Sequence, residues 1–186
     1  MEKAESVIET PIPVMDAEAI RRALRRIAHE IVERNAAPAE VVLAGIPARG
    51  NELARRIAEA IGSISKVTVP LGTIDVAMHR DDVGTRPELP MVRASHLPLP
   101  LENRTVIIVD DVLFTGRTVR AAMDAISSFG RPAKIQLAVL IDRGHRELPI
   151  RPDYVGKNLP TAHDEKVRLQ LGGEGEGVWL VKEEKS

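Results

Sequence analysis

TVIIVDDVLFTGRTVRAAMDAISSFG, residues 105–130, has the pattern of a strand, a loop and a helix in direct succession. The β-branched run Thr105–Val109 is typical of a strand that is buried on both faces of a parallel sheet. A loop is predicted over residues 112–118, and apolar residues then recur at helical spacing as far as Gly130. Because ligands bind beyond the carboxyl ends of parallel strands, this loop is the predicted site.

Two adjacent carboxylates, Asp110 and Asp111, follow the predicted strand, and the loop behind them contains Thr115, Gly116 and Thr118. Backbone N–H groups at a helix N-terminus form an anion site, which the helix dipole strengthens. Adjacent carboxylates would repel a phosphate, so they suit sugar hydroxyls or a Mg²⁺ that bridges ligand oxygens. The predicted ligand therefore has a phosphate, vicinal hydroxyls and a metal ion. The alternative is an ordinary strand–helix turn that happens to carry two aspartates.

The chain has 186 residues, which predicts one domain over residues 1–186 with a sizeable core. Its formal net charge is −1, so any site for a polyanion must come from local clustering of basic residues. Cysteine is absent, which excludes disulfides and thiolate metal ligands. No apolar stretch is as long as a membrane span and no signal peptide is present, so we expect a cytoplasmic protein without membrane contact.

A second strand–loop–helix unit lies earlier in the chain. Val41–Ile46 predicts a buried strand, and an amphipathic helix is predicted from Asn51 to Ile61. The turn between them contains Arg49 and Gly50, so its N–H groups and one guanidinium can hold a second anion. A plain turn with a surface arginine is the alternative, but a diphosphate ligand needs a second cradle.

Ala133–Ile141 predicts another buried strand, which ends at Asp142 and Arg143. A right-handed crossover places this end at the same sheet edge as residues 105–109, where the base of a nucleotide can bind. Residues 149–161 have a loop-like pattern. Further strands are predicted at residues 66–69, 72–78, 166–171 and 178–181, the last two as a hairpin.

Residues 79–103 are rich in proline and have no periodic pattern, which is typical of a functional lid in a compact domain. Arg80 lies at the start of this insertion and could close over a diphosphate. A solvated loop without a function is the alternative.

The first predicted helix, from Asp16 as N-cap to about Asn35, has an unusually basic face. Arg21–Arg25 and Arg22–Arg26 are like-charge pairs at i,i+4 spacing, which destabilise an isolated helix slightly. Such a face indicates either a solvated surface balanced by nearby glutamates or a binding surface for a polyanion.

Five segments carry a resemblance to a known family: residues 19–34, 45–50, 80–82, 109–125 and 135–161. The pattern of four apolar residues, two acidic residues and a T-G-x-[ST] turn is similar to the phosphoribosyl-pyrophosphate (PRPP) loop of type I phosphoribosyltransferases. The segment IQLAVLIDRGHRELPIRPDYVGKNLPT is more specific. From about Asp16 to Trp179 the chain resembles the bifunctional pyrimidine operon regulators, which are also uracil phosphoribosyltransferases.

The resemblance implies an α/β fold of the type I phosphoribosyltransferases, in which helices flank a central parallel sheet. A small hood is expected from the chain ends and residues 79–103. The implied activities are conversion of uracil and PRPP to UMP and pyrophosphate with Mg²⁺, and binding of a hairpin in pyrimidine-operon leader mRNA in response to UMP or UTP. A homodimer or homotetramer is expected.

The resemblance also implies roles for particular residues. The implied catalytic residues are Asp110, Asp111, Arg49 and Arg80, with Asp110 and Asp111 meeting the metal mainly through ligand and water. The implied contacts to PRPP or nucleotide are Ala48, Arg49, Gly50, Val109, Asp110, Asp111, Val112, Leu113, Phe114, Thr115, Gly116, Arg117, Thr118, Ile141, Asp142 and Arg143. The implied RNA contacts are Arg25, Arg26, His29, Arg34, His145, Arg146, Arg151, Lys157 and Thr161.

Several positions depart from the family pattern. Ala48 stands where relatives usually have threonine, and Glu52 adds a carboxylate beside the predicted diphosphate site. Phe114 occupies a position where some relatives have an acidic general base. Two alternatives therefore stay open: an RNA-binding nucleotide sensor with little or no catalysis, and a phosphoribosyltransferase for another base.

Overall fold

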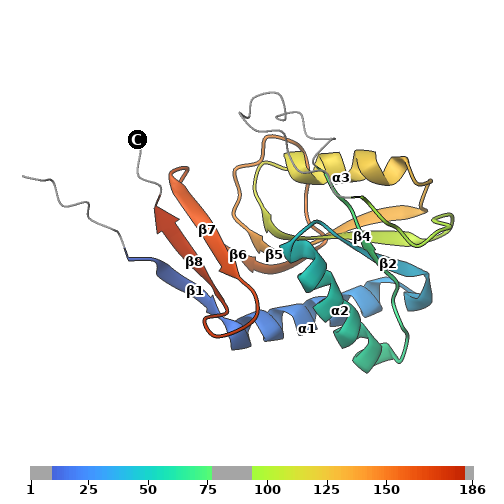
Figure 1. The fold of residues 1–186 in the computed structure, drawn as a ribbon, viewed down its shortest axis with the longest axis horizontal. Helices are drawn as coiled ribbons and strands as arrows, with labels where there is room; N and C mark the ends of the chain where they lie inside the picture. Colours follow the sequence, from blue (N-terminus) through green and yellow to red (C-terminus); the bar gives the residue numbers. More distant parts are fainter. Residues whose placement is uncertain (1–9, 77–93, 183–186) are drawn as a thin grey trace, which may run out of the picture.

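The computed structural model describes residues 10–76 and 94–182. Five parallel strands form the central sheet in the order β3-β2-β4-β5-β6; β2, β4, β5 and β6 are labelled in Figure 1. This confirms the predicted α/β fold. The strands are β2 (Val41–Gly45), β3 (Leu71–Thr73), β4 (Thr105–Leu113), β5 (Lys134–Asp142) and β6 (Tyr154–Asn158).

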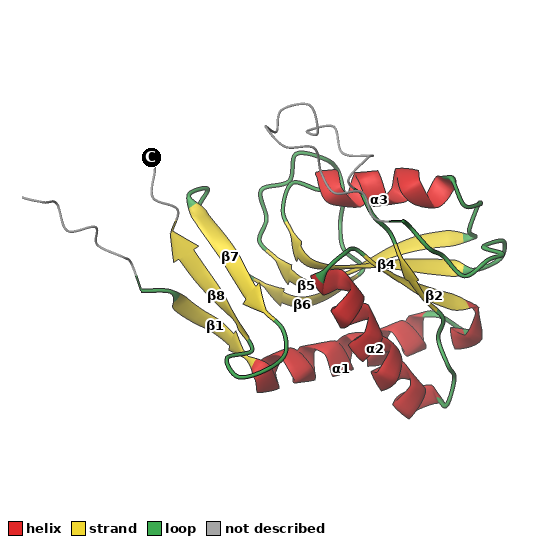
Figure 2. Cartoon of the chain, in the orientation of Figure 1, coloured by secondary structure: helices red, strands yellow, loops and turns green. Residues whose placement is uncertain are grey.

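Helices cover both faces of this sheet because the residues of β4 alternate between two cores. Ile107 and Val109 pack with α1 (Ala17–Arg34) and α2 (Arg49–Ser65) on one face. Val106 and Ile108 pack with α3 (Arg117–Ser127) on the other, and Figure 2 shows the helices on opposite sides. Burial on both faces explains the continuous apolar run in the sequence.

The helix termini follow the local chemistry. The Asp16 carboxylate accepts a hydrogen bond from the Ala19 N–H at 2.7 Å and caps α1, as predicted. Gly116 precedes α3 with φ of 95°, a conformation that other residues rarely adopt. A short 3₁₀ helix, Pro38–Glu40, leads from α1 into β2.

A second, antiparallel sheet forms the hood from the two ends of the chain. Its order is β1-β8-β7, with β1 (Ile12–Asp16), β8 (Gly177–Lys182) and β7 (Glu165–Gln170). The hairpin predicted at residues 166–171 and 178–181 is confirmed as β7 and β8. The part of the hood that was predicted from the chain ends is therefore present.

The second half of the expected 79–103 insertion belongs to the main body. Leu97 and Leu101 are buried in the core beside α3, and His96 forms a bridge with Thr73 of β3. Apolar side chains in a proline-rich segment can be buried without any helix or strand period, which is why the pattern was misleading. Residues 79–93, including Arg80, lie outside the described residues.

Four predictions were wrong: three strands in extent or existence, and one loop. β4 continues past the predicted end to Leu113, because Val112 and Leu113 pair with β5. Residues 66–69 form no strand, and of residues 72–76 only 72 and 73 belong to one. Residues 154–158 form β6, although the whole segment 149–161 was predicted as loop.

β6 escaped the pattern because glycine and polar residues interrupt it. Tyr154 is fully buried, whereas Lys157 and Asn158 are exposed. Gly156 allows close packing, since a Cβ there would lie 2.4 Å from the carbonyl oxygen of Leu140. Among the residues in the two described ranges, no helix has the length and apolarity to span a membrane.

Candidate active site and basic surface

The predicted site residues of β2, β4 and β5 come together at the carboxyl ends of these strands. We call this region the ligand edge; it comprises residues 47–50, Asp110, Asp111, residues 114–118, Asp142 and Arg143. A pocket of about 330 Å³ at this edge is lined by Ile46, Pro47, Ala48, Arg49, Gly50, Asp110 and Asp111. Parallel strands place these segments together although the sequence separates them by about sixty residues.

Glycine lets the first loop of the ligand edge press against β4. A Cβ on Gly50 would lie 2.4 Å from the carbonyl oxygen of Val109, so any larger residue would push α2 away from β4. The carbonyl of Val109 also accepts a hydrogen bond from the Ile46 N–H at 3.0 Å. The start of α2 is thereby held beside the two aspartates.

Asp110 and Asp111 are held by their own backbone. The Asp110 Oδ1 accepts from the Asp111 N–H at 2.9 Å, and the Asp111 Oδ1 accepts from the Val112 N–H at 2.8 Å. The second Asp111 oxygen pairs with the Arg49 guanidinium at 3.2 Å, and this arginine is about half exposed. The loop arginine and the strand aspartates therefore share one pocket.

These carboxylates meet the requirements of a Mg²⁺ that is held largely by its ligand. Magnesium is commonly bound by one or two carboxylates, waters and substrate phosphates rather than by an all-protein cage. Within the described ranges, no group of three or more His, Cys, Asp or Glu side chains could enclose a metal ion. The donor set of Asp110 and Asp111 therefore suits a metal that arrives with a phosphorylated ligand.

Residues 114–118, which we call the phosphate loop after their predicted role, join the end of β4 to the first turn of α3. The Thr115 Oγ1 accepts a hydrogen bond from the Arg117 N–H at 3.3 Å, and the Arg120 N–H donates to the Gly116 carbonyl at 3.0 Å. The loop thus opens directly into the helix. N–H groups in the first turn of a helix are suited to a phosphate.

The other end of the ligand edge is built around Arg143, which is 7% exposed. Its guanidinium lies 4.1 Å from the ring centroid of Phe114 and donates to Thr161 Oγ1 and to the carbonyls of Ala162 and Glu165. A pocket of about 380 Å³ adjoins it, lined by residues 142–145, Asn158, Pro160 and Thr161. The sequence identified Arg143 but gave no sign of this stacking.

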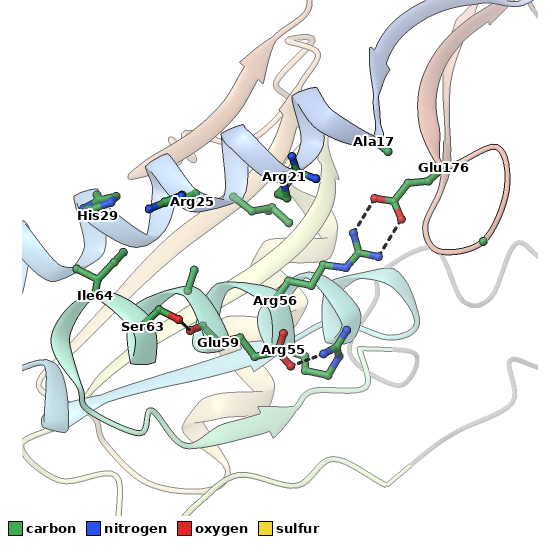
Figure 3. A pocket seen from close by; sticks show the side chains of 13 residues that line it. Ala17, Arg21, Arg25, His29, Arg55, Arg56, Glu59, Ser63, Ile64 and Glu176 are labelled. Carbon is green, nitrogen blue, oxygen red and sulfur yellow. Dashed lines mark hydrogen bonds and ion pairs between the residues drawn. The ribbon is translucent and has the colours of Figure 1, made fainter.

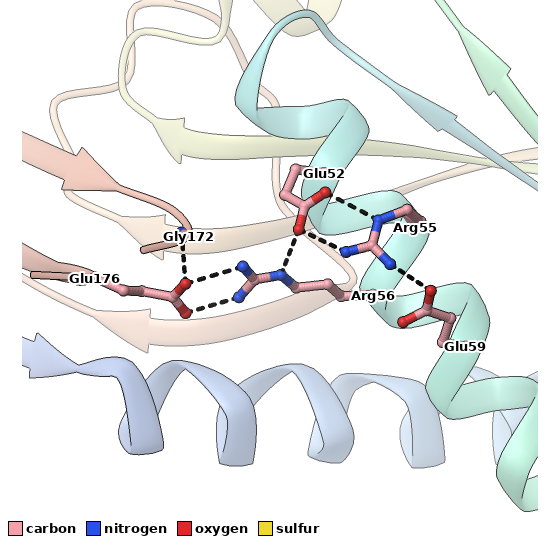
Figure 4. A network of polar contacts seen from close by, with 6 residues as sticks. All are labelled: Glu52, Arg55, Arg56, Glu59, Gly172 and Glu176. Carbon is pink, nitrogen blue, oxygen red and sulfur yellow. Dashed lines mark hydrogen bonds and ion pairs between the residues drawn. The ribbon is translucent and has the colours of Figure 1, made fainter. Parts of the chain in front are cut away.

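Glu52 is less harmful to a diphosphate than the sequence suggested. Its carboxylate accepts hydrogen bonds from Arg55 and from Arg56, as Figure 4 shows. The hydrogen bond from Arg55, opposed by burial but reinforced by Arg56, lowers the pKa of Glu52 to about 2. Its negative charge is therefore balanced within α2.

Arg56 also joins α2 to the hood. Its two terminal nitrogens donate to the Glu176 carboxylate at 2.7 and 2.9 Å, and Glu176 accepts from the Gly172 N–H at 2.6 Å (Figure 4). The hydrogen bond from Arg56 lowers the pKa of Glu176. Because the partners are 120 residues apart, the sequence gave no signal for this link.

The predicted RNA contacts, which we call the basic surface, divide into two groups. In the described part of the chain, the structure gives no hydrogen bond or ion pair for the side chains of Arg25, His29, Arg151 and Lys157. Arg25 and His29 line a groove of about 1010 Å³ between α1 and α2, shown in Figure 3. Arg151 and Lys157 are exposed beside and on β6.

The other five members of the basic surface bind other parts of the chain. Arg26 donates to the carbonyls of Val155 and Gly156 at 3.1 and 2.7 Å, which covers the open edge of β6. Arg34 donates to the Asp153 carbonyl at 3.0 Å. The remaining contacts are those of His145 with the Thr161 carbonyl, of Thr161 with Arg143, and of Arg146 with four acceptors.

Comparison with known proteins identifies the class. The family model described as "Phosphoribosyl transferase domain" matches residues 14–169. A crystal structure of the hypoxanthine phosphoribosyltransferase of Trypanosoma cruzi superposes with a TM-score of 0.70 at 20% identity, covering 93% of this chain and 97% of that one. A hypoxanthine-guanine phosphoribosyltransferase from Bacillus anthracis gives 0.69 at 18% identity, covering 94% and 99%. At such identities the solved structures show the fold alone.

Two curated relatives narrow the assignment. A protein named "Bifunctional protein PyrR" from a Roseiflexus species is 56% identical over 172 residues, which is 91% of this chain and 94% of the relative. A protein of the same name from Brevibacillus brevis is 57% identical over 158 residues, 85% of this chain and 88% of the relative. The chain belongs to the family of bifunctional PyrR proteins.

Proposed function

We propose that this protein transfers the 5-phosphoribosyl group of PRPP to N1 of uracil, and that it regulates pyrimidine genes by binding leader mRNA. The observation that carries the enzymatic part is the meeting of Arg49, Asp110 and Asp111 in one pocket, with the phosphate loop directly after them. Membership of the PyrR family supports both parts.

The first step of the proposed reaction is separation of pyrophosphate from C1′ of the ribose. Arg49 and the N–H groups at the start of α2 hold the leaving pyrophosphate, which gains charge as the bond breaks. Asp110 and Asp111 hold the ribose hydroxyls, and their negative charge favours the oxocarbenium character that develops at C1′. Bound Mg²⁺ would neutralise part of the charge on the leaving group.

The phosphate loop and the end of β5 position the other two parts of the substrates. Residues 115–118 hold the 5′-phosphate at the start of α3, which fixes the ribose relative to the two aspartates. Uracil lies near residues 141–143, and its N1 forms the new bond to C1′. Because Phe114 cannot accept a proton, the N1 proton passes to another group or to the departing pyrophosphate.

The basic surface provides the proposed RNA site. Half-exposed Arg26 and Arg34 retain N–H donors beyond those used on Glu30, Asp153 and β6, and Arg151 and Lys157 are exposed nearby. These groups suit the phosphates and 2′-hydroxyls of an RNA hairpin. UMP or UTP in the ligand edge would raise RNA affinity, and we propose a cytoplasmic homodimer or homotetramer.

The decisive experiment incubates the protein with uracil, PRPP and Mg²⁺ and follows UMP, beside an Asp111→Asn variant. UMP formation that the variant abolishes supports the enzyme and places Asp111 in its site. A folded protein that binds UMP but forms none contradicts the catalytic part. Competition between uracil, hypoxanthine and guanine in the same assay tests whether the protein transfers phosphoribose to a base other than uracil.

A nucleotide-sensing regulator without catalysis is the second candidate. Ala48 is the N-cap of α2 and supplies no side-chain hydrogen bond, so the pyrophosphate loop lacks the hydroxyl common in relatives. An Ala48→Thr variant tests this second candidate. If the missing hydroxyl limits catalysis, restoring it should raise the rate of UMP formation.

A further inference from the structure

A second pocket adjoins the ligand edge on the side of the hood. It has a volume of about 650 Å³ and is lined by Ala48, Arg49 and Glu52 of the first loop and α2 and by residues 168–172 of the hood; we call it the hood pocket. Ala48 and Arg49 also line the pocket that contains the two aspartates. A ligand that is held at Arg49 can therefore extend from the aspartates towards the hood.

The hood side of this pocket is the outer edge of β7. Consecutive side chains of a strand point to opposite faces, so a pocket lined by residues 168, 169 and 170 in succession runs along the strand's edge. In the order β1-β8-β7, β7 is the last strand, and among the described strands it pairs with β8 alone. Its free edge therefore faces the start of α2.

Contacts with the body of the protein anchor β7 at both ends. At the start of β7, the Arg143 guanidinium donates to the Glu165 carbonyl at 2.6 Å. Beyond the other end, the Gly172 N–H and the Arg56 guanidinium of α2 both donate to the Glu176 carboxylate, as Figure 4 shows. The edge of β7 is thus held in place opposite Arg49 and Glu52.

The charges of the hood pocket favour an anion. Arg168 is exposed, and within residues 10–76 and 94–182 the structure gives no hydrogen bond or ion pair for its side chain. The second guanidinium is that of Arg49, which faces Asp111 at 3.2 Å. Glu52 is the one carboxylate among the described lining residues, and arginines of its own helix balance it. The pocket therefore has an excess of positive charge.

We propose that Arg168 is a substrate-binding residue, which contacts the diphosphate of PRPP from the hood while Arg49 contacts it from the first loop. This rests on the proposed function and adds a residue of the hood to it. A diphosphate carries several negative charges, and Arg49 shares its own charge with Asp111. A second guanidinium can bind further phosphate oxygens through two parallel hydrogen bonds. These contacts strengthen as charge develops on the leaving pyrophosphate.

The phosphates of RNA are another anion that an exposed arginine can bind, but the position of the hood pocket favours the diphosphate. The hood pocket shares two residues with the pocket of the aspartates, and none of its described lining residues belongs to the basic surface. A concave site between two elements is also typical of a small ligand.

The test compares pyrophosphate with UMP as ligands of Arg168→Gln, because UMP has no diphosphate. Isothermal calorimetry with pyrophosphate and Mg²⁺ should show affinity weakened by about tenfold or more, the effect of losing charge-assisted hydrogen bonds. The affinity for UMP should stay unchanged, and the KM for PRPP should rise by a factor similar to that for pyrophosphate. Equal weakening of UMP and pyrophosphate would overturn the inference, since it would show a general disturbance of the ligand edge.

Two further variants separate direct contact from the general charge of the hood. Lys166→Gln is the matched control, because Lys166 is exposed on the same face of β7 but does not line the hood pocket. It should leave pyrophosphate affinity unchanged, and a loss equal to that of Arg168→Gln would overturn the inference. Arg168→Glu places a carboxylate opposite the diphosphate and should weaken pyrophosphate binding further. Thermal unfolding checks that each variant is folded.

The outcomes separate this inference from the proposed function. If the unchanged protein binds pyrophosphate but forms no UMP, the catalytic part of the proposed function is wrong, and calorimetry on the Arg168 variants still decides the inference. If the unchanged protein forms UMP, and Arg168→Gln keeps its affinity for pyrophosphate and its KM for PRPP, only the inference is overturned. Weaker binding of a labelled leader hairpin with unchanged pyrophosphate affinity would also overturn it, by assigning Arg168 to RNA.

Discussion

The ligand edge and the basic surface differ in how their side chains are held. At the ligand edge, the Asp110 and Asp111 carboxylates accept hydrogen bonds from the next backbone N–H in the chain. In the basic surface, Arg26 reaches carbonyls 129 and 130 residues away. The two aspartates are thus oriented by their own backbone, whereas Arg26 also joins α1 to β6.

This difference has a consequence for mutation. By the proposed function, a change at Asp110 or Asp111 removes a group aimed at the ligand, so it should affect turnover without much effect on folding. A change in the basic surface can remove an RNA contact, a structural contact or both. Variants therefore have to be measured for stability as well as for function.

Asp111→Asn should give the largest effect. We expect UMP formation to fall by about a hundredfold or more, because a charge that balances the transition state becomes neutral. The measurement is kcat/KM for PRPP at saturating uracil. Asp164→Asn, at an exposed aspartate, is the control. A twofold effect at Asp111 would show that the ligand edge does not hold the ribose.

Arg49→Ala should have the next largest effect. Loss of the guanidinium removes a cation for pyrophosphate and the ion-pair partner of Asp111, so the KM for PRPP should rise by about tenfold or more. Arg49→Lys should recover part of this, since a lysine keeps the charge without the fork. Equal KM values for PRPP in the unchanged protein and both Arg49 variants would mean that Arg49 does not contact pyrophosphate.

Arg26→Ala and Lys157→Ala compare the two kinds of residue within the basic surface. Lys157→Ala should weaken hairpin binding several-fold and lower the salt dependence of log K by about one phosphate contact. Arg26→Ala should also destabilise the fold by about 1 kcal/mol, because two hydrogen bonds to β6 are lost.

Thermal unfolding distinguishes these two variants. A loss of about 1 kcal/mol lowers the Tm of a chain of this size by about 2–4 °C. Arg26→Ala should show that shift and Lys157→Ala should not. Identical Tm values would mean that the contacts of Arg26 with β6 contribute nothing to stability, and that its role is confined to the surface.

The same contrast explains what the sequence could predict. Residues 105–130 revealed the strand, the two aspartates and the helix, because strand period, helix period and turn glycine are local signals. The end of β4 and the whole of β6 were missed, since their pairing with β5 depends on contacts distant in sequence. The inward orientation of Arg146 was also invisible, because arginine at an exposed-looking loop position has no pattern that reveals its acceptors.

The smallest expected effect is at Glu52, in the first turn of α2. This residue lies beside the ligand edge and also belongs to a network of ion pairs that extends to the hood. Its pKa is lowered from 4.5 to about 2, chiefly by the hydrogen bond from Arg55. The unfolded chain therefore takes up the proton at a higher pH than the folded one. The stabilising contribution is complete above about pH 4.5 and is lost as the pH falls towards 2.

Glu52→Gln should consequently flatten the decline in stability between pH 5 and pH 3, roughly the upper part of that interval. Urea unfolding at several pH values measures this slope, with Glu40→Gln, at an exposed glutamate, as the control. The effect should be small, because Glu52 is about one-third exposed and water screens its ion pairs. If Glu52→Gln has the same pH dependence of unfolding free energy as the unchanged protein, Arg55 and Arg56 stabilise the Glu52 carboxylate equally well in the folded and the unfolded chain. The arginines would then hold Glu52 in place without contributing to the stability of the fold.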